Sequence, residues 1–401
     1  MSSLPKNQLD NPGTVGRQEN PPVTVVGGSA AGLFTAALLA RKGIKAQVLE
    51  QSDRLEPISR TLIVTHKFRN VLGDLLAEKA IVNEIRRFEL FTDGRSATIP
   101  LHKPDLIIER SALIKGLAEE AQGRGVELKF GRRFQNLRAN GTGLIVECDS
   151  SSSRAEEIKA QTVVGGDGAV SRVAQAAGWP RQETVPLVQA IVDLPKDMPH
   201  NTVRVWFVPD DTPYFYWLIP DSENRGVLGL IGESTQSTRK HLERFMEKRH
   251  FEPQSFQGAR IPLYKKWIPV KREIEGKPVY LVGDAAGQVK VTTIGGIVTG
   301  FRGALGVAEA IANGGASGEL RRLRFELNVH LLLRKALHRF QQPDYSRLVD
   351  LLDAQARQSL GEHSRDDAMR VMWRLFVRQP RLLLMGLRGL LTGGFPTPTQ
   401  S

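Results

Sequence analysis

The chain has 401 residues, of which 41% are hydrophobic and 24% charged, and this is the composition of a globular protein with a sizeable core. Its single cysteine excludes an intramolecular disulfide and a multi-cysteine zinc site, so we expect a cytoplasmic protein without a metal. The net charge of +12 suits anionic partners or simply solubility, and no apolar run is long enough to cross a bilayer.

The first ordered elements should form a compact unit behind a polar tail at residues 1–21. A short β-branched strand is expected at 23–26, followed by a glycine-rich turn at 27–32. A helix-like segment then ends at Gly43, and a second strand covers 45–50. Strand, turn, helix and strand in this order predict a βαβ unit.

The turn of this unit has the form of a dinucleotide fingerprint in which a serine replaces the middle glycine. Small residues let a pyrophosphate approach the backbone at the helix N-terminus, where unpaired N–H groups favour negative charge. A carboxylate at the end of the second strand can accept hydrogen bonds from ribose hydroxyls. The candidates for dinucleotide binding are Gly27, Gly28, Ser29, Ala30, Ala31, Gly32 and Glu50. The alternative is a glycine-rich turn without a ligand.

The pattern after residue 60 is mixed. We expect helices near 68–80 and from Ser111, and strands at 126–130 and around 144–150. The serine run 150–153 is interpreted as a hairpin tip, the alternative being a linker.

A second glycine-rich turn joins a strand to a short helix at 163–172. Its Gly166 and Asp167 are candidates for cofactor binding. The alternative is an acidic residue that only caps the helix.

A third motif, at 280–297, is the most specific of the three. A strand delivers Asp284 to a glycine turn, where its carboxylate can bind the ribityl hydroxyls of a flavin. A second turn then begins a helix whose N-terminus can stabilise negative charge on the reduced ring. The candidates for cofactor binding here are Gly283, Asp284, Gly295, Gly296 and Ile297. The alternative is a pair of unrelated glycine turns.

Taken in order, the three motifs resemble the flavoprotein family that includes aromatic hydroxylases, flavin halogenases and geranylgeranyl reductases. The resemblance implies an α/β fold with FAD as cofactor: a Rossmann-like FAD-binding domain of aromatic-hydroxylase type, an inserted β-sheet substrate domain and a C-terminal helical region. It also implies that Arg110, and with less support Arg60, lies near the FAD, the alternative being a surface arginine. The expected segments are a flexible tail (1–21), the first part of the FAD-binding domain (22–184), a β-rich substrate domain (185–275), the second part of the FAD-binding domain (276–318) and a helical region (319–401).

Two stretches are most similar to the geranylgeranyl reductase branch. Residues 283–297 resemble its GDAAGxVxPxTxGGI pattern, and residues 213–220 resemble PxYxWxFP. Alternate residues of the second stretch would share one strand face and roof an apolar cavity over the flavin, unless they are ordinary sheet core. The candidates for this substrate cavity are Tyr214, Phe215, Tyr216, Trp217 and Ile219. Two departures are the missing Cys-Gly-Gly segment after the second strand and Val291 in place of proline.

The resemblance implies an FAD-dependent oxidoreductase that reduces C=C bonds of a prenyl or similar apolar substrate by hydride transfer from reduced flavin. No second dinucleotide fingerprint is present, so NAD(P)H or another donor would dock transiently. No catalytic residue is assigned; Tyr214 and Tyr216 are the only suggestions for a proton donor. The alternatives are a monooxygenase or halogenase, with Lys67 as the one nearby lysine of halogenase type, and a flavin- or lipid-binding carrier without turnover.

The basic character of the chain is strongest towards its end. Residues 321–391 hold 14 Lys or Arg against 7 Asp or Glu, interleaved with leucines. Such a surface predicts peripheral contact with an anionic membrane, the alternative being a solvated helical cap. Nucleic acid is not expected, because the basic residues follow no recognisable module.

Overall fold

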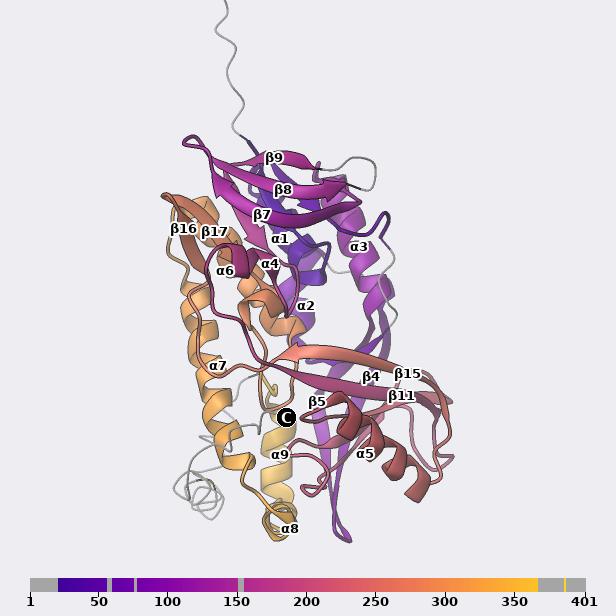
Figure 1. Ribbon diagram of the computed structural model, residues 1–401. Helices are drawn as coiled ribbons and strands as arrows, with labels where there is room; N and C mark the ends of the chain where they lie inside the picture. The colour runs from indigo at the N-terminus through magenta and orange to yellow at the C-terminus, as the bar shows by residue number, and fades with distance from the viewer. Residues whose placement is uncertain (1–20, 56–59, 76–77, 151–154, 367–385, 387–401) are drawn as a thin grey trace, which may run out of the picture.

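The computed structural model describes residues 21–55, 60–75, 78–150, 155–366 and 386. Figure 1 shows a small three-stranded sheet at the top, a larger sheet in the lower half, and helix α7 along the left edge. Most of the predicted tail, the centre of the serine run and the basic residues beyond 366, apart from residue 386, lie outside the described residues.

The predicted βαβ unit forms the centre of a six-stranded sheet. The sheet order is β16-β17-β10-β1-β2-β6, and all neighbours are parallel except β16 and β17. The four valine and threonine residues of β1 are buried on both faces, as expected of a central parallel strand. The strands are β1 (Val23–Val26), β2 (Ala46–Leu49), β6 (Glu127–Lys129), β10 (Thr162–Gly165), β16 (Lys271–Ile274) and β17 (Lys277–Leu281).

Helices α1 (Ala30–Arg41), α3 (Arg110–Gly123) and α6 (Ile297–Asn313) pack around this sheet. α1 contacts both other helices, and the rings of Phe34 and Phe301 lie 4.7 Å apart between α1 and α6. The short helix α4 (Arg172–Ala176) follows β10. A separate antiparallel sheet consists of β7 (Arg132–Ala139), β8 (Leu144–Ser150) and β9 (Glu156–Ala160).

An eight-stranded sheet makes up the lower half of the molecule, in the order β15-β11-β14-β13-β12-β4-β5-β3. It contains the predicted β-rich segment but also three strands from residues 61–109, because β4 pairs in parallel with β12. The domain boundaries stay a prediction. The strands are β3 (Thr61–Val64), β4 (Ile81–Thr92), β5 (Arg95–Glu109), β11 (Thr184–Asp193), β12 (Thr202–Trp206), β13 (Tyr216–Pro220), β14 (Arg225–Ile231) and β15 (Pro253–Pro262).

The helix predicted near 68–80 is shorter than expected. α2 covers only Lys67–Leu72, because Gly73 takes a positive φ of 56° that ends the helix. Two single turns of 3₁₀ helix follow, at Gly73–Leu75 and Glu78–Ala80. The prediction of a helix here was right at its start and wrong at its end.

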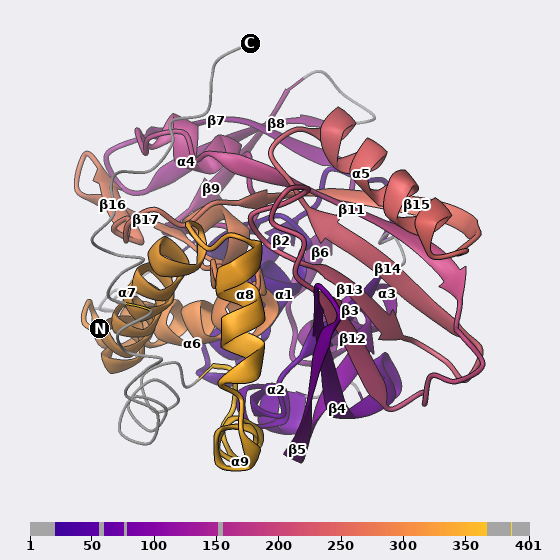
Figure 2. The same cartoon turned by 90° about the horizontal axis from the view of Figure 1, so that it is seen from below.

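The remaining helices are α5 (Thr235–Lys248), which packs on β11 and β14, and α7 (Gly318–Leu337), α8 (Gln342–Asp350) and α9 (Ala354–Glu362) at the C-terminal side. Seen from below, α7 and α8 lie on one side of the molecule and α5 on the other (Figure 2). Within the described ranges, no helix is both long and apolar enough to cross a membrane.

Candidate active site

Hydrogen bonds fix the first glycine turn to the ends of two other strands, β2 and β10. The Gly28 N–H donates to Glu50 Oε2 at 2.8 Å, and the Ser29 hydroxyl donates to the Gly166 carbonyl at 2.7 Å. A side chain at Gly27 could not fit, since its Cβ would lie 2.6 Å from that same carbonyl. The serine in the middle of the fingerprint therefore fastens the turn to β10 while keeping side-chain bulk low.

The open N-terminus of α1 starts at this turn. Ser29 caps the helix, because its hydroxyl oxygen accepts from the Gly32 N–H at 3.2 Å. No acidic residue lies in the first turn of α1, which leaves the helix dipole free to attract a phosphate. The turn thus has the shape and polarity of a pyrophosphate cradle.

Asp167 caps a helix, which is the alternative role that the sequence left open for it. Its carboxylate accepts from the Ser171 hydroxyl at 2.6 Å and from the backbone N–H groups of Arg172 and Val173 at 2.7 and 3.1 Å. Burial nevertheless raises the pKa of Asp167 above its usual range. The carboxylate is used to cap α4, so we no longer place it on the cofactor; Gly166 stays at the turn through its carbonyl.

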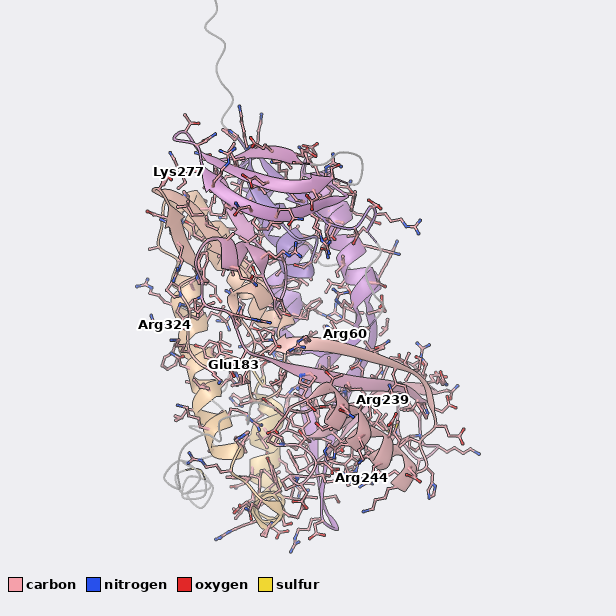
Figure 3. All side chains as sticks on the ribbon, viewed as in Figure 1. Arg60, Glu183, Arg239, Arg244, Lys277 and Arg324 are labelled. Atoms are coloured by element: carbon pink, nitrogen blue, oxygen red, sulfur yellow. The ribbon has the colours of Figure 1, made fainter. Side chains whose placement is uncertain are left out.

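Asp284 is half-buried in the turn after β17, and two arginines act on it. Burial raises the pKa of Asp284, while the positive charges of Arg60 and Arg110 oppose that shift. Both arginines are placed by the pairing of β3 with β5, and the Arg110 N–H donates to the Arg60 carbonyl at 3.0 Å. Figure 3 shows Arg60 at the centre of the molecule, where the upper and lower halves meet.

Glu109 also belongs to this cluster, because its charge acts on Arg110 and its carboxylate accepts from the Arg60 N–H at 3.2 Å. The Arg60 Nε is buried without a hydrogen-bond partner among the described residues, and burial lowers the pKa of both guanidinium groups. A buried donor without a partner is costly, so the site calls for an added acceptor. The oxygen-rich, negatively charged ribityl-pyrophosphate portion of FAD meets this requirement.

The third motif completes the cradle. Gly283 has φ of 61°, and a Cβ there would lie 2.7 Å from the Cβ of Ala31, so this turn lies against the start of α1. A Cβ at Gly296 would lie 3.2 Å from Asp284 Oδ1. Gly295 pairs with Lys290 across an isolated β-bridge, and Ile297 begins α6. The sequence motifs therefore meet at one place.

The predicted substrate residues divide between two faces of β13. Tyr214, Trp217 and Ile219 belong to one apolar cluster with Val289 and Ile294, which flank the Gly295-Gly296 turn. Phe215 is half-buried and packs against the same cluster. This face therefore adjoins the Gly295-Gly296 turn, as a substrate cavity beside the predicted flavin site requires.

Tyr216 lies on the opposite face. Its ring stacks on Phe245 of α5 at 4.0 Å, and its hydroxyl donates to Asp211 Oδ2 at 2.9 Å. Burial and this carboxylate raise the pKa of Tyr216 far above its usual range. We therefore remove Tyr216 from the substrate cavity and from the candidates for a proton donor.

Sequence reasoning missed a buried ion pair beside the same turn. The Lys290 ammonium donates to Asp366, and Asp366 also accepts from the Thr65 hydroxyl. The paired side chains of Lys290 and Asp366 are 7% and 1% exposed. The only signal was one lysine in the otherwise uncharged stretch from 285 to 301.

Two further buried residues near this turn were also missed. His330 of α7 shares a 2.8 Å hydrogen bond with the Thr292 hydroxyl, and burial lowers the pKa of His330 to about 3, so its ring is neutral. Gln288 accepts from the Gly283 N–H at 2.8 Å. Its amide also fills the space beside Gly303 of α6, where any Cβ would overlap it.

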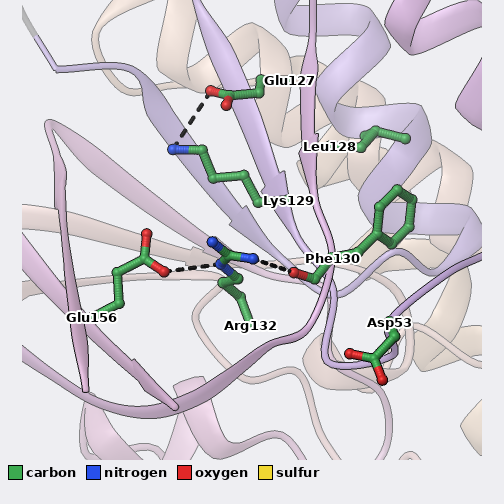
Figure 4. A pocket seen from close by; sticks show the side chains of 7 residues that line it. All are labelled: Asp53, Glu127, Leu128, Lys129, Phe130, Arg132 and Glu156. Carbon is green, nitrogen blue, oxygen red and sulfur yellow. Dashed lines mark hydrogen bonds and ion pairs between the residues drawn. The ribbon is translucent and has the colours of Figure 1, made fainter. Parts of the chain in front are cut away.

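A surface hollow of about 690 Å³ is shown in Figure 4. Two of its lining residues, Lys129 and Arg132, form backbone hydrogen bonds with Glu50, the predicted ribose ligand. Arg132 also donates to Glu156 at 2.9 Å and to the Phe130 carbonyl at 2.7 Å. The lining residues are Asp53, Glu127, Leu128, Lys129, Phe130, Arg132 and Glu156. None of them belongs to the Asp284 turn, so we interpret the hollow as a neighbour of the adenosine end and not as a substrate cavity.

Comparison with known proteins agrees with this geometry. A family model described as FAD binding domain matches residues 20–320. The rice chloroplastic geranylgeranyl diphosphate reductase is 28% identical over 324 residues, which cover 74% of this chain and 67% of that protein. A digeranylgeranylglycerophospholipid reductase from Methanothrix thermoacetophila is 25% identical over 402 residues, which cover 92% and 99% of the two chains.

Solved structures confirm the expected fold class. A geranylgeranyl bacteriochlorophyll reductase-like protein from Thermoplasma acidophilum superposes with a TM-score of 0.76 at 17% identity, covering 93% of this chain and all of that one. The flavin-dependent brominase Bmp2 superposes with a TM-score of 0.63 at 15% identity, covering 91% and 100%. These likenesses show the fold that the three motifs predicted.

The Gly283 turn gives a test of cofactor binding. We expect Gly283→Ala to weaken FAD binding by roughly tenfold or more, because a left-handed backbone with a Cβ costs about 1–2 kcal/mol and the new atom would meet Ala31. Quenching of flavin fluorescence on titration of the apoprotein measures the affinity. Gly258→Ala in β15 is the matched control, since its Cβ would have only a 3.6 Å neighbour. Equal affinities for the two variants would contradict the assignment.

The buried ion pair gives a test of stability. We expect Asp366→Asn to lower the free energy of unfolding by about 3–5 kcal/mol, because it leaves a buried ammonium unpaired, and the double variant Lys290→Met/Asp366→Leu to recover most of the loss. The exposed pair Arg95–Asp350 is the control: Asp350→Asn should cost at most about 1 kcal/mol. Denaturant titration measures each value.

The same pair predicts a pH dependence. Lys290 holds the pKa of Asp366 well below its ordinary value of about 3.9. Its stabilising contribution is therefore complete above that pH and is lost as the pH falls through and below it. Asp366→Asn should remove this part of the acid sensitivity, and unfolding curves that keep the wild-type slope below pH 4 would count against the pair.

Proposed function

The chain belongs to the FAD-binding-domain family and is an FAD-dependent oxidoreductase, and on this basis we propose that it reduces C=C bonds of a prenyl or similarly apolar substrate. The names of its curated relatives, which are reductases of geranylgeranyl compounds, support this proposal. The observation that carries it is the apolar face of β13, where Trp217 and Ile219 pack with Val289 and Ile294 of the flavin-binding turn.

The residues of this chain have separable tasks in the proposed reaction. Reduced flavin, when bound, supplies a hydride. Asp284 would hold the ribityl hydroxyls, and the charges of Arg60 and Arg110 would offset those of the pyrophosphate. The apolar cluster around Trp217 would exclude water and align the chain of an apolar substrate.

The electron donor is proposed to be NAD(P)H or another carrier that docks transiently. The sequence holds one dinucleotide fingerprint, and the match to the FAD-binding family covers it, which supports its use for FAD. Stopped-flow reduction of the FAD-loaded protein with NADH, NADPH and dithionite tests this point. A flavin that only dithionite reduces would exclude a nicotinamide donor.

The reaction itself is tested by mass spectrometry of the product after anaerobic incubation of the reduced enzyme with prenyl lipids and with aromatic compounds. We expect the prenyl product to gain two hydrogens for each double bond reduced. A product that gains oxygen in air, or halide when halide is added, would instead show the monooxygenase or halogenase alternative, for which the fold of the Bmp2 brominase is the supporting observation. FAD absorbance without any turnover would instead support the non-enzymatic alternative, a flavin- or lipid-binding carrier.

The halogenase alternative has one specific residue. Lys67 is the first residue of α2, and its charge acts on the buried carboxylate of Glu326 in α7. The guanidinium of Arg302, which binds Glu326 at 2.6 Å, contributes more to this carboxylate than Lys67 does. Lys67 therefore stays the candidate lysine of the halogenase alternative.

Tyr214 is the remaining candidate for a proton donor. It lies in the apolar cluster beside the flavin-binding turn, and the guanidinium of Arg334 stacks on its ring at 4.0 Å. We expect Tyr214→Phe to slow product formation by about 100-fold or more while FAD affinity and flavin reduction stay unchanged. Tyr216→Phe is the control, because that hydroxyl lies on the other face of the sheet and should affect stability alone. Equal rates in wild type and Tyr214→Phe would exclude this role.

A further inference from the structure

Helix α7 turns its two carboxylates away from solvent. Glu319 and Glu326 both bind Arg302 of α6, at 2.5 and 2.6 Å, and all three side chains are less than a fifth exposed. Arg302 therefore binds both acidic residues of the helix from its inner side. Among the described residues, Arg322 is the one cation on the outer side of α7 within 4 Å of either carboxylate.

The outer face of α7 carries exposed basic and apolar side chains together. Arg321, Phe325, Asn328 and Leu332 recur at intervals of three and four residues, so they lie on one face, and all are exposed. Phe325 is 56% and Leu332 is 44% exposed, which makes them two of the four exposed large hydrophobic residues in the described part of the chain. We call this surface, with the adjacent Arg324, the α7 outer face.

The two arginines of the α7 outer face form no ion pairs with the described residues. Arg321 and Arg324 pair with no carboxylate of the described residues, and Arg322 is 3.9 Å from a Glu319 that already binds Arg302. Figure 3 shows Arg324 pointing outward from the edge of the molecule.

A neighbouring loop extends the basic surface. The Tyr264 hydroxyl donates to Asn328 Oδ1 at 2.6 Å, which fixes the loop against α7. Lys266 is exposed in this loop. Lys265 forms an ion pair with the nearby Glu183 at 2.6 Å. The negative charge of Glu183 is therefore paired with Lys265 and not with the arginines of α7.

The inner face of the same helix contacts the flavin-binding turn. Leu323 and Leu327 pack with Val291, and His330 bonds Thr292. α7 is therefore a single layer between the outer surface and the proposed reaction centre. Whatever binds the α7 outer face is brought to the side of the molecule where the flavin would lie.

We propose that the α7 outer face docks on an anionic lipid surface, with Phe325 and Leu332 entering the headgroup boundary and Arg321 and Arg324 binding lipid phosphates. A basic face with exposed aromatic and aliphatic side chains is the pattern of interfacial helices. The chain's net charge of +12 adds long-range attraction to such a surface. The role of this docking, delivery of an apolar lipid substrate, rests on the proposed function, whereas the docking itself does not.

The test is flotation of the full-length, FAD-loaded protein with vesicles of phosphatidylcholine alone or mixed with phosphatidylglycerol, at low and high salt. We expect binding only to the anionic vesicles. Arg321→Gln/Arg324→Gln should weaken it by roughly fivefold for each arginine, because one basic residue near an anionic surface contributes about that factor. Phe325→Ser/Leu332→Ser should also weaken it, while the remaining binding keeps its sensitivity to salt.

Matched controls use exposed residues on other elements. Lys240→Gln/Lys248→Gln removes two charges from α5, and Val82→Ser/Val170→Ser removes the other two exposed hydrophobic residues. Both controls should bind anionic vesicles as wild type does. All of these sites are exposed, so every variant should keep the wild-type unfolding temperature.

Three outcomes would overturn the proposal: wild type that ignores anionic vesicles, α7 variants that bind as wild type does, or a dimer that Phe325→Ser/Leu332→Ser converts to a monomer in light scattering. The last result would make the α7 outer face a contact between two copies. Product formation from a detergent-dispersed prenyl lipid, measured on the same variants, separates this proposal from the proposed function. In detergent, the α7 variants should reduce the prenyl lipid as wild type does. If no protein forms product while vesicle binding is intact, the proposed reaction is refuted and the docking proposal stands.

Discussion

Two half-buried guanidinium groups act on the half-buried carboxylate of Asp284, and the site is arranged around this contact. Arg60 and Arg110 flank the strand pair β3–β5, whereas Asp284 follows β17, so the two large sheets must meet for the three charges to come together. A buried donor without a partner, such as the Arg60 Nε, is costly unless an added acceptor completes it. An oxygen-rich cofactor would thus complete the hydrogen bonding of the fold as well as supply its chemistry.

The glycine turns were predictable because each is specified by neighbours in sequence. Each turn combines three local signals within a few positions: the end of a strand, a glycine whose Cβ would not fit, and the start of a helix. Gly27 and Gly283 are the examples. Asp167 shows the limit of this reasoning: the residue type that binds a ligand also caps a helix, and only its three short hydrogen bonds to α4 distinguish the two. The sequence could not exclude Tyr216 from the substrate face. Alternation along β13 shows which residues share a face, but not which face lies toward the Gly295-Gly296 turn.

Long-range pairs could not be predicted. Lys290 and Asp366 are 76 positions apart, and neither is flanked by a pattern that names the other. The same holds for β4, which joins β12 across more than 100 residues and draws an early segment into the second sheet. Sequence periodicity identifies strands, whereas the order of strands in a sheet depends on the packing of the whole chain. Burial of a charge is decided at that later level.

The fit between Gln288 and Gly303 has a consequence for how this turn can change over time. Any residue larger than glycine at 303 would overlap the Gln288 amide, and that amide holds the Gly283 N–H. A lineage must therefore shorten position 288 before position 303 can grow, and the intermediate loses the bond that shapes the turn. Substitutions at positions 288 and 303 can therefore be accepted in one order only. The evolutionary history of the chain, as well as its chemistry, limits which residues can stand at these two positions.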